Sequence, residues 1–108
     1  MGVFDIIICF GVLYHLRYPL LGIDMVRRVC RGAAYFESAC IDRDVRIKNQ
    51  SVPLDRFDKR LLDIPLSQFF RRGELNNDDS NWFSFNKTCL EEMLRSSGFV
   101  VDRTTLVN

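Results

Sequence analysis

The stretch FDIIICF at Phe4–Phe10 decides the fold. It is a short, continuous apolar run rich in β-branched and aromatic residues, a pattern typical of a strand buried on both faces of a parallel sheet. A helix is predicted over residues 19–31, because a proline suits its first turn, arginines suit its last turn and Gly32 is placed to cap it. A second strand is predicted over residues 33–41. This order predicts a βαβ unit with parallel strands and a right-handed crossover.

The chain is less regular between this unit and residue 85. Apolar residues between positions 54 and 62 have the spacing of one short helix, which Pro65 would end. Polar residues at 76–81 predict a turn before the aromatic stretch at 82–85. A long loop in a compact domain is more often functional than idle, so this segment is a candidate part of a site.

A second helix is predicted from residue 86 or 88 to residue 97, since Thr88 and Glu91 have the spacing of a capping box and Gly98 suits its end. A third strand is predicted over residues 99–103, with an extension as far as residue 107. The predicted fold class is therefore α/β, with the order β-α-β-loop-α-β. The first strand lies near the start of the chain and no element follows the last, so we expect a piece of a larger sheet.

Length and composition are those of one globular domain. The chain has 108 residues, of which 47% are hydrophobic and 27% charged, and these values exclude a disordered or collagenous protein. Fifteen Lys and Arg residues against fourteen Asp and Glu give a net charge of +1. The charge therefore argues against a general nucleic-acid surface, although Arg27, Arg28 and Arg31 form a local basic cluster.

The four cysteines and the single histidine do not have the spacing of a metal site, so we expect no metal. Reduced and mostly buried thiols are expected. The apolar run at residues 3–13 lacks a basic leader and is shorter than the roughly 20 residues that a membrane helix needs. We therefore expect a cytoplasmic protein without a membrane partner.

Two motifs carry a resemblance to a known family. Residues 11–15 read GVLYH and are followed at Pro19 by the start of a helix, while residues 82–86 read WFSFN before CLEEML at 89–94. This pattern resembles class I S-adenosylmethionine-dependent methyltransferases, in the branch of the bacterial tRNA wobble-uridine carboxymethyltransferase and its relatives. Those relatives show Trp-Trp-x-Pro-Asn before the helix, whereas Phe83 and Phe85 stand here in place of the second Trp and the Pro.

The resemblance spans nearly the whole chain and implies the carboxyl-terminal part of a Rossmann-like methyltransferase sheet. The half with the glycine-rich loop and the acidic ribose partner would be missing. The implied cofactor is S-adenosylmethionine or a close derivative, and the implied substrate is an RNA base or a small molecule. Ligands of open α/β sheets bind beyond the carboxyl ends of the strands. In the resembling family the positions that match Phe10 and Tyr14 line the cofactor pocket, and Gly11 would let the backbone pass close to a ligand. The candidate cofactor-binding residues are therefore Phe10, Gly11, Val12 and Tyr14. The alternative is that Phe10 and Tyr14 are core aromatics.

Three further side chains are candidates, each with a competing interpretation. His15 is a candidate general base, and the alternative is a structural histidine held by hydrogen bonds. Arg17 is a candidate for binding a phosphate or carboxylate, and the alternative is an ordinary surface role. Trp82 is a candidate for stacking on a substrate base, and the alternative is a lid buried over the sheet. Asp5 begins the strand at the end away from the crevice, so its expected role is structural.

The predicted function is thus that of a methyltransferase fragment, in which the isolated chain binds cofactor poorly and is inactive. A non-catalytic remnant or interaction module that keeps half of the fold is the alternative. A third hypothesis, RNA binding through the three arginines and the aromatic loop, is weaker because the chain is nearly neutral. The exposed edge of Phe4–Phe10 predicts self-association, since an unpaired apolar edge is a template for another strand.

Overall fold

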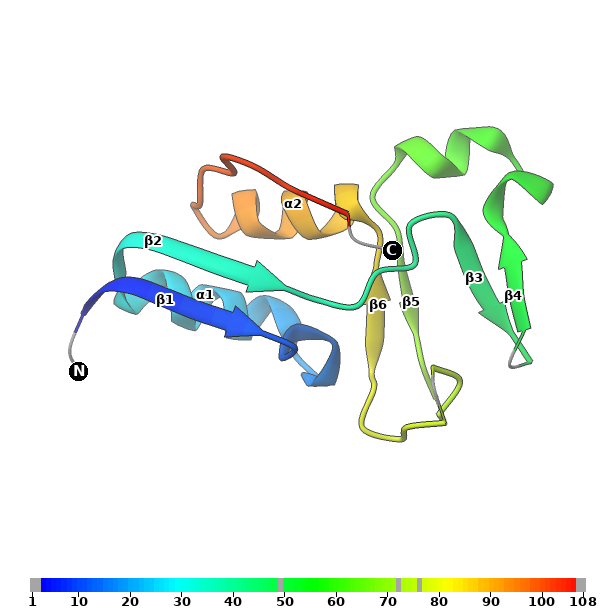
Figure 1. Cartoon of the computed structure of the whole chain (residues 1–108), viewed down its shortest axis with the longest axis horizontal. Coiled ribbons are helices and arrows are strands. Elements are labelled where there is room, and N and C mark those ends of the chain that lie inside the picture. Colours follow the sequence, from blue (N-terminus) through cyan, green and yellow to red (C-terminus); the bar gives the residue numbers. More distant parts are fainter. Residues whose placement is uncertain (1–2, 49, 72, 76, 107–108) are drawn as a thin grey trace.

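The computed structural model describes residues 3–48, 50–71, 73–75 and 77–106 (Figure 1). It is a mixed α/β structure in which the described residues form two helices, three short 3-10 helices and three two-stranded sheets. The elements in chain order are β1 Phe4–Phe10, η1 Leu13–His15, α1 Pro19–Val29, β2 Cys30–Glu37, β3 Asp44–Ile47, β4 Gln50–Pro53, η2 Leu54–Arg56, η3 Lys59–Asp63, β5 Ser67–Phe69, β6 Phe83–Phe85 and α2 Lys87–Ser96.

The predicted βαβ unit is confirmed. β1 and β2 pair in parallel, with Ile6 opposite Ala33, Ile8 opposite Tyr35 and Phe10 opposite Glu37. In Figure 1 both strands point the same way, β2 lies above β1 and α1 lies behind them, which makes the crossover right-handed. The boundaries differ from the prediction, because α1 ends at Val29 and β2 runs only from Cys30 to Glu37.

The prediction that Gly32 caps the helix is wrong, because Gly32 lies inside β2. A Cβ atom at this position would collide with the carbonyl oxygen of Asp5 in the neighbouring strand. The register between the strands is also irregular here, between Phe4 and Ile6. Glycine is therefore needed at position 32 because two backbones approach each other closely, and not because a helix ends there.

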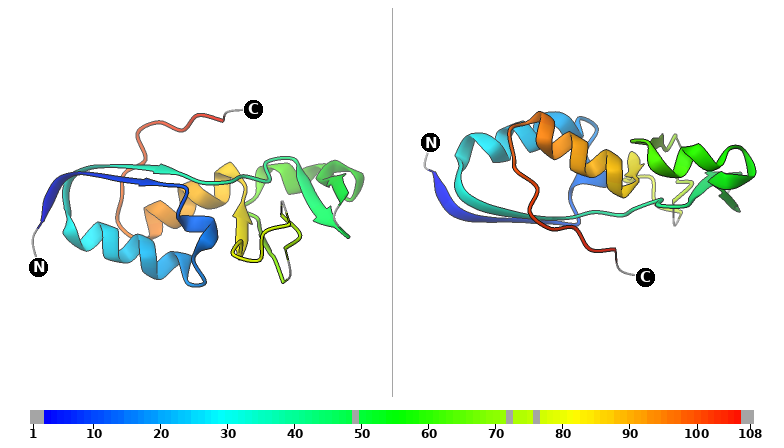
Figure 2. Two further views of the ribbon diagram at one scale, coloured as in Figure 1. Left: turned by 60° about the horizontal axis from the view of Figure 1, so that its bottom comes forward. Right: turned by 90° about the horizontal axis from the view of Figure 1, so that it is seen from above.

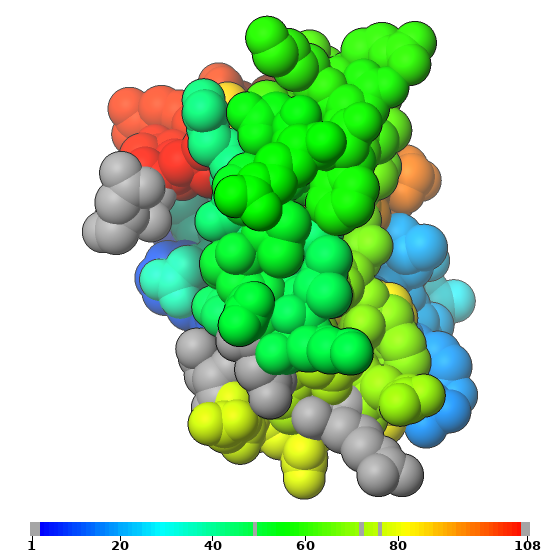
Figure 3. Space-filling view, turned by 90° about the vertical axis from the view of Figure 1, so that its right-hand side faces the viewer, coloured from blue at the N-terminus to red at the C-terminus, as the bar shows by residue number. Residues whose placement is uncertain are grey.

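The irregular middle of the chain contains more structure than predicted. β3 and β4 form an antiparallel hairpin, and η2 and η3 replace the single short helix expected between residues 54 and 62. These elements make up one end of the molecule (Figure 3). The aromatic stretch is a strand, β6, which pairs antiparallel with β5. Asn76 of the predicted polar turn lies outside the described residues.

The second helix is confirmed, but its cap is Asn86 and not Thr88. The Asn86 side chain accepts a hydrogen bond from the Cys89 amide at 2.8 Å. At the other end Gly98 has a φ of 99°, and the next amide, of Phe99, donates to the Leu94 carbonyl, as in a Schellman C-cap.

The predicted strand at 99–103 is wrong, because no ladder forms over residues 99–106. The Phe99 ring instead packs edge-on against Phe36 of β2, with ring centroids 5.6 Å apart. Val100 is 94% exposed, so its side chain does not pack against the sheet as that of a buried strand residue would. Val107, to which the strand was expected to extend, lies outside the described residues.

The core lies on one side of the parallel strands. Leu13, Ile23 and Phe85 form its buried centre, and side chains of α2 and β2 pack around them. α1 and α2 lie on the same side of β1 and β2 (Figure 2). The prediction that β1 is buried on both faces is therefore wrong: every second side chain from Phe4 to Phe10 is exposed on the face without helices.

Candidate active site

The carboxyl ends of β1 and β2 form a rim from which the chain leaves the sheet. The Gly11 amide donates to the Glu37 carbonyl at 3.0 Å, which ties the ends of the two strands together. Gly11 has a φ of 66°, in the left-handed region, and this turns the chain sharply into η1. Buried Leu13 anchors the turn, whereas Phe10 and Val12 remain exposed. Glu37 is a rim residue that the sequence analysis did not single out.

The Trp82 loop lies against the same rim. The Trp82 amide donates to the Tyr14 carbonyl at 2.8 Å, and the Trp82 carbonyl accepts from the Phe70 amide at 2.7 Å. The backbone of this one residue therefore joins the turn after β1 to the β5–β6 pair. Residues separated by most of the chain length are brought to one edge of the parallel strands.

His15 is held by the polar turn that precedes Trp82. Its Nδ1 lies 2.9 Å from the Ser80 carbonyl oxygen and 3.2 Å from the Ser80 hydroxyl. A carbonyl oxygen only accepts, so this partner favours the tautomer with the proton on Nδ1. The neutral ring then keeps an unprotonated Nε2, the atom that a general base requires. Both interpretations of His15, structural and catalytic, are compatible with this geometry.

Asp78 and Ser80 complete this cluster; the sequence analysis placed them in the polar turn but did not propose them as site residues. The Ser80 hydroxyl donates to Asp78 Oδ1 at 2.6 Å, and the Ser80 amide donates to the same oxygen at 2.9 Å. These hydrogen bonds lower the pKa of the Asp78 carboxyl below its usual value, and the bond from the Ser80 hydroxyl has the largest effect. The Asp-x-Ser spacing in a polar turn is the sequence signal that points to such a local bond.

Arg17 and Trp82, the two predicted substrate-binding residues, form one unit. The Arg17 guanidinium carbon lies 5.1 Å from the centre of the Trp82 ring, in cation–π geometry. Phe69 of β5 stacks beside the same indole, with centroids 6.3 Å apart. The indole is half-buried, so it is neither a fully covered lid nor a free platform. A base that stacks on the face held by Arg17 has to displace the guanidinium.

The basic cluster lies at the opposite end of the strand pair from the Trp82 loop (Figure 1). Arg27 donates to the carbonyls of Cys30 and Gly98, and Arg31 pairs with Asp5 at 2.5 Å. Asp5 thus lies in an exposed ion pair at the end of β1 away from the rim. Two of the three arginines are engaged in contacts within the chain, and the cluster does not join the aromatic loop in one RNA-binding surface.

The cysteines are free thiols, but they are less buried than expected. Cys30 is buried, Cys9 and Cys89 are half-buried, and Cys40 is exposed. Cys9 packs against the core, and burial raises the pKa of its thiol. A raised pKa reduces the thiolate fraction, so Cys9 is poorly suited to act as a nucleophile with His15.

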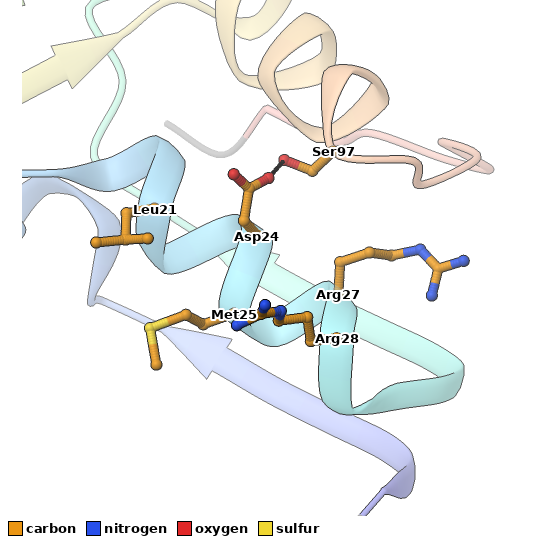
Figure 4. A pocket seen from close by; sticks show the side chains of 6 residues that line it. All are labelled: Leu21, Asp24, Met25, Arg27, Arg28 and Ser97. Atoms are coloured by element: carbon orange, nitrogen blue, oxygen red, sulfur yellow. Dashed lines mark hydrogen bonds between the residues drawn. The ribbon is translucent and has the colours of Figure 1, made fainter.

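Two hollows on the molecule are lined by residues other than the predicted site residues. One of about 630 Å³ lies between α1 and the end of α2, where Ser97 donates to Asp24 at 2.5 Å (Figure 4). Its other lining residues are Leu21, Met25, Arg27 and Arg28. A second hollow, of about 320 Å³, lies beside β3 and β4. Neither of these two hollows lies at the rim that carries the candidate site residues.

Two searches concern the residues that the structure describes. No group of three or more His, Cys, Asp or Glu side chains in this part of the chain could hold a metal ion. None of the described helices is long and apolar enough to cross a membrane.

Comparison with known proteins found no family model, no curated protein and no solved structure that matches the chain.

Proposed function

We propose that the chain supplies the carboxyl-side rim of an S-adenosylmethionine-dependent methyltransferase of the cytoplasm. The observation that carries the proposal is the hydrogen bond from the Trp82 amide to the Tyr14 carbonyl. It places the second resembling motif beside the first, at the edge of a parallel sheet where ligands of such sheets bind. A Rossmann-like arrangement that continues β1 and β2 is part of this proposal.

The rim residues fit the purine end of the cofactor. Phe10 offers an exposed aromatic ring, and Gly11 lets the backbone approach a ligand closely. Tyr14, whose ring lies 4.2 Å from that of His15, borders the same turn. When bound, the cofactor would supply an electrophilic methyl group on a sulfonium. The glycine-rich loop that binds the methionine end in the resembling family has no counterpart in this sequence.

The other rim residues would orient the substrate. Trp82 and Arg17 would hold a planar ring, either an RNA base or an aromatic small molecule, through stacking and cation–π contacts. His15 Nε2 would accept a proton from the attacking atom, while Ser80 keeps the ring in one orientation. Methyl transfer depends mainly on in-line positioning, so the loss of His15 should reduce the rate less than the loss of Trp82.

The test is a titration of the ¹⁵N-labelled chain with S-adenosylmethionine, followed by NMR. We expect weak binding, with a Kd of about 1 mM, because hydrogen bonds worth about 0.5–1.5 kcal/mol each are missing with the glycine-rich loop. Shift changes should cluster at the amides of residues 10–15 and at the Trp82 indole. Tyr14→Ala should remove them, and Arg28→Ala, at the far end of α1, should leave them unchanged.

Two results would contradict the proposal. Shift changes confined to the α1–α2 hollow would show that the cofactor binds there and not at the rim. The absence of any shift change up to 10 mM S-adenosylmethionine would show that the chain does not bind this cofactor. Micromolar affinity would contradict the expected weakness of the isolated chain and show that this rim binds the cofactor without a second half.

A further inference from the structure

The face of β1 and β2 opposite the helices is an unpartnered apolar surface. Its side chains are 55% exposed at Phe4, 64% at Ile6, 65% at Ile8, 54% at Phe10 and 54% at Tyr35. These five residues, which we call the open-face patch, belong to a parallel pair, and parallel sheets are normally covered on both faces. The described residues cover only one of the two faces with helices (Figure 2).

The patch has the size of an interface. Each side chain leaves about 110 Å² exposed, if a large residue has about 200 Å² in all, so the patch measures about 550 Å². This is close to the upper end of the largest patches on ordinary monomers, about 300–600 Å². Two such patches facing each other would bury about 1,100 Å², above the roughly 1,000 Å² that a specific interface requires.

The patch is also symmetric along β1. On either side of Ile7 the exposed positions repeat in mirror order, with Ile6 and Ile8 next to the centre and Phe4 and Phe10 outside. A two-fold axis across the strands at Ile7 would place Phe4 over Phe10 of a second copy, and Ile6 over Ile8. Isologous interfaces need this self-complementarity. Asp5, the acidic residue within β1, is paired with Arg31. Glu37 of β2, opposite Phe10, is an exposed charged residue at the border of the patch.

We propose that the open-face patch docks a second copy of this chain, face to face about this two-fold axis. The two strand pairs would lie about 10 Å apart, as sheets do when their side chains interdigitate. The inference rests on the β1–β2 face alone and not on the proposed methyltransferase function. The two proposals compete for Phe10, because the dimer would cover the ring that the cofactor would contact.

The experiment is sedimentation velocity of the full chain over a concentration series from about 1 to 200 μM. We expect a monomer–dimer equilibrium in this range. Ile8→Glu and Ile6→Lys should each weaken the dimer by more than about tenfold, because each would bury an unpaired charge. An equimolar mixture of the two variants should restore it, since the new Glu and Lys meet only in the mixed dimer. Leu20→Lys changes an exposed apolar residue on α1, 50% exposed, and should have no effect.

Tyr35→Lys distinguishes the proposed face-to-face dimer from a dimer in which two β1 strands pair edge to edge. The edge-to-edge dimer would also place Ile6 opposite Ile8, so the charge-swap variants alone do not tell the two apart. Face-to-face docking buries Tyr35 on β2, so this variant should be monomeric. A dimer that survives Tyr35→Lys and protects the Ile6 and Ile8 amides from hydrogen exchange would show edge pairing and overturn the proposal. A wild-type chain that stays monomeric at every concentration, or mixed variants that fail to restore a dimer, would also overturn it.

Discussion

At the scale of single residues, Gly11 and Gly32 are required for different physical reasons. Gly11 adopts a φ of 66°, whereas Gly32 lies where the backbone of β1 leaves no room for a Cβ atom. Gly11→Ala should therefore cost about 1 kcal/mol of unfolding free energy, the usual penalty for a left-handed L-residue. Gly32→Ala should cost more, about 2–3 kcal/mol, because a strand has to shift. Urea unfolding of both variants measures the difference, and equal losses would contradict this account.

Asp78 provides a prediction of pH dependence. Its folded pKa is lowered by the hydrogen bonds from Ser80, so its contribution to stability is present above the ordinary carboxyl pKa and is lost as the pH falls through the folded value. Ser80→Ala should raise the pKa of Asp78 back toward its usual value of about 3.9. Carboxyl ¹³C chemical shifts recorded between pH 2 and 6 give the pKa of Asp78 in the wild type and in Ser80→Ala. An unchanged pKa in Ser80→Ala would show that the hydroxyl does not control the carboxyl.

At the scale of elements, α2 is joined to the rest of the fold through the residue that caps its start. Buried Asn86 accepts hydrogen bonds from the amides of Cys89 and Leu66, at 2.8 and 3.0 Å, and donates to the Ile64 carbonyl at 2.7 Å. The same side chain therefore caps the helix and fixes the segment before β5.

Asn86→Ala should reduce the free energy of unfolding by about 2–3 kcal/mol, because a cap is worth about 1 kcal/mol and its other partners lose their bonds. Asn86→Ser keeps an oxygen that can cap the helix and adds no charge, so it should cost about 1 kcal/mol less than the alanine variant. Thermal unfolding followed by circular dichroism compares the two variants. A serine variant as unstable as the alanine variant would contradict the capping role.

At the scale of the whole molecule, the chain is elongated and its core is small. The radius of gyration is 14.6 Å, against about 13 Å for a typical domain of this length. The principal extents are 45 × 29 × 22 Å. Phe85, only 2% exposed, joins Leu13 and Ile23 at the centre of the core. Much of the stability should therefore depend on this one ring.

Phe85→Ala should cost about 3–5 kcal/mol, the usual loss for a buried aromatic residue. A domain of this size has only about 5–15 kcal/mol in total, so a large part of the variant should be unfolded at 37 °C. Phe57→Ala is the matched control, because Phe57 is 60% exposed and should change stability by less than about 1 kcal/mol. Chemical unfolding of both variants is the measurement, and similar losses would show that the core lies elsewhere.

The sequence predicts the elements whose signals are local. The apolar run of β1, the proline at the start of α1 and the glycine at the end of α2 each act within a few residues, and all three elements form. The β3–β4 hairpin was missed because its turn has no glycine signal: Lys48 itself adopts a φ of 49°. The strand expected after Gly98 was wrong because Phe99 packs onto a sheet face, a tertiary contact that no local pattern reveals.

The candidate site was predictable in part. The proximity of Trp82 to Tyr14 agrees with the rule that ligand-binding residues gather at the carboxyl ends of the strands, whereas periodicity gave no sign of it. The bond between His15 and Ser80 joins residues 65 positions apart, so local spacing gave no sign of it. The open face of β1 was also unpredictable, since a continuous apolar run looks the same whether one face or both are covered.

The position of Phe85 in the core has a consequence for the chain during its synthesis on the ribosome. Leu13 and Ile23 emerge early, but Phe85 follows Ile23 by about sixty residues, or roughly 3–12 s at usual rates of translation. During that interval the early βαβ unit has apolar side chains in water on both faces of its strands. During this interval chaperones that hold exposed apolar segments should bind the nascent chain, and their binding should weaken when β6 and α2 leave the ribosome and cover the core face.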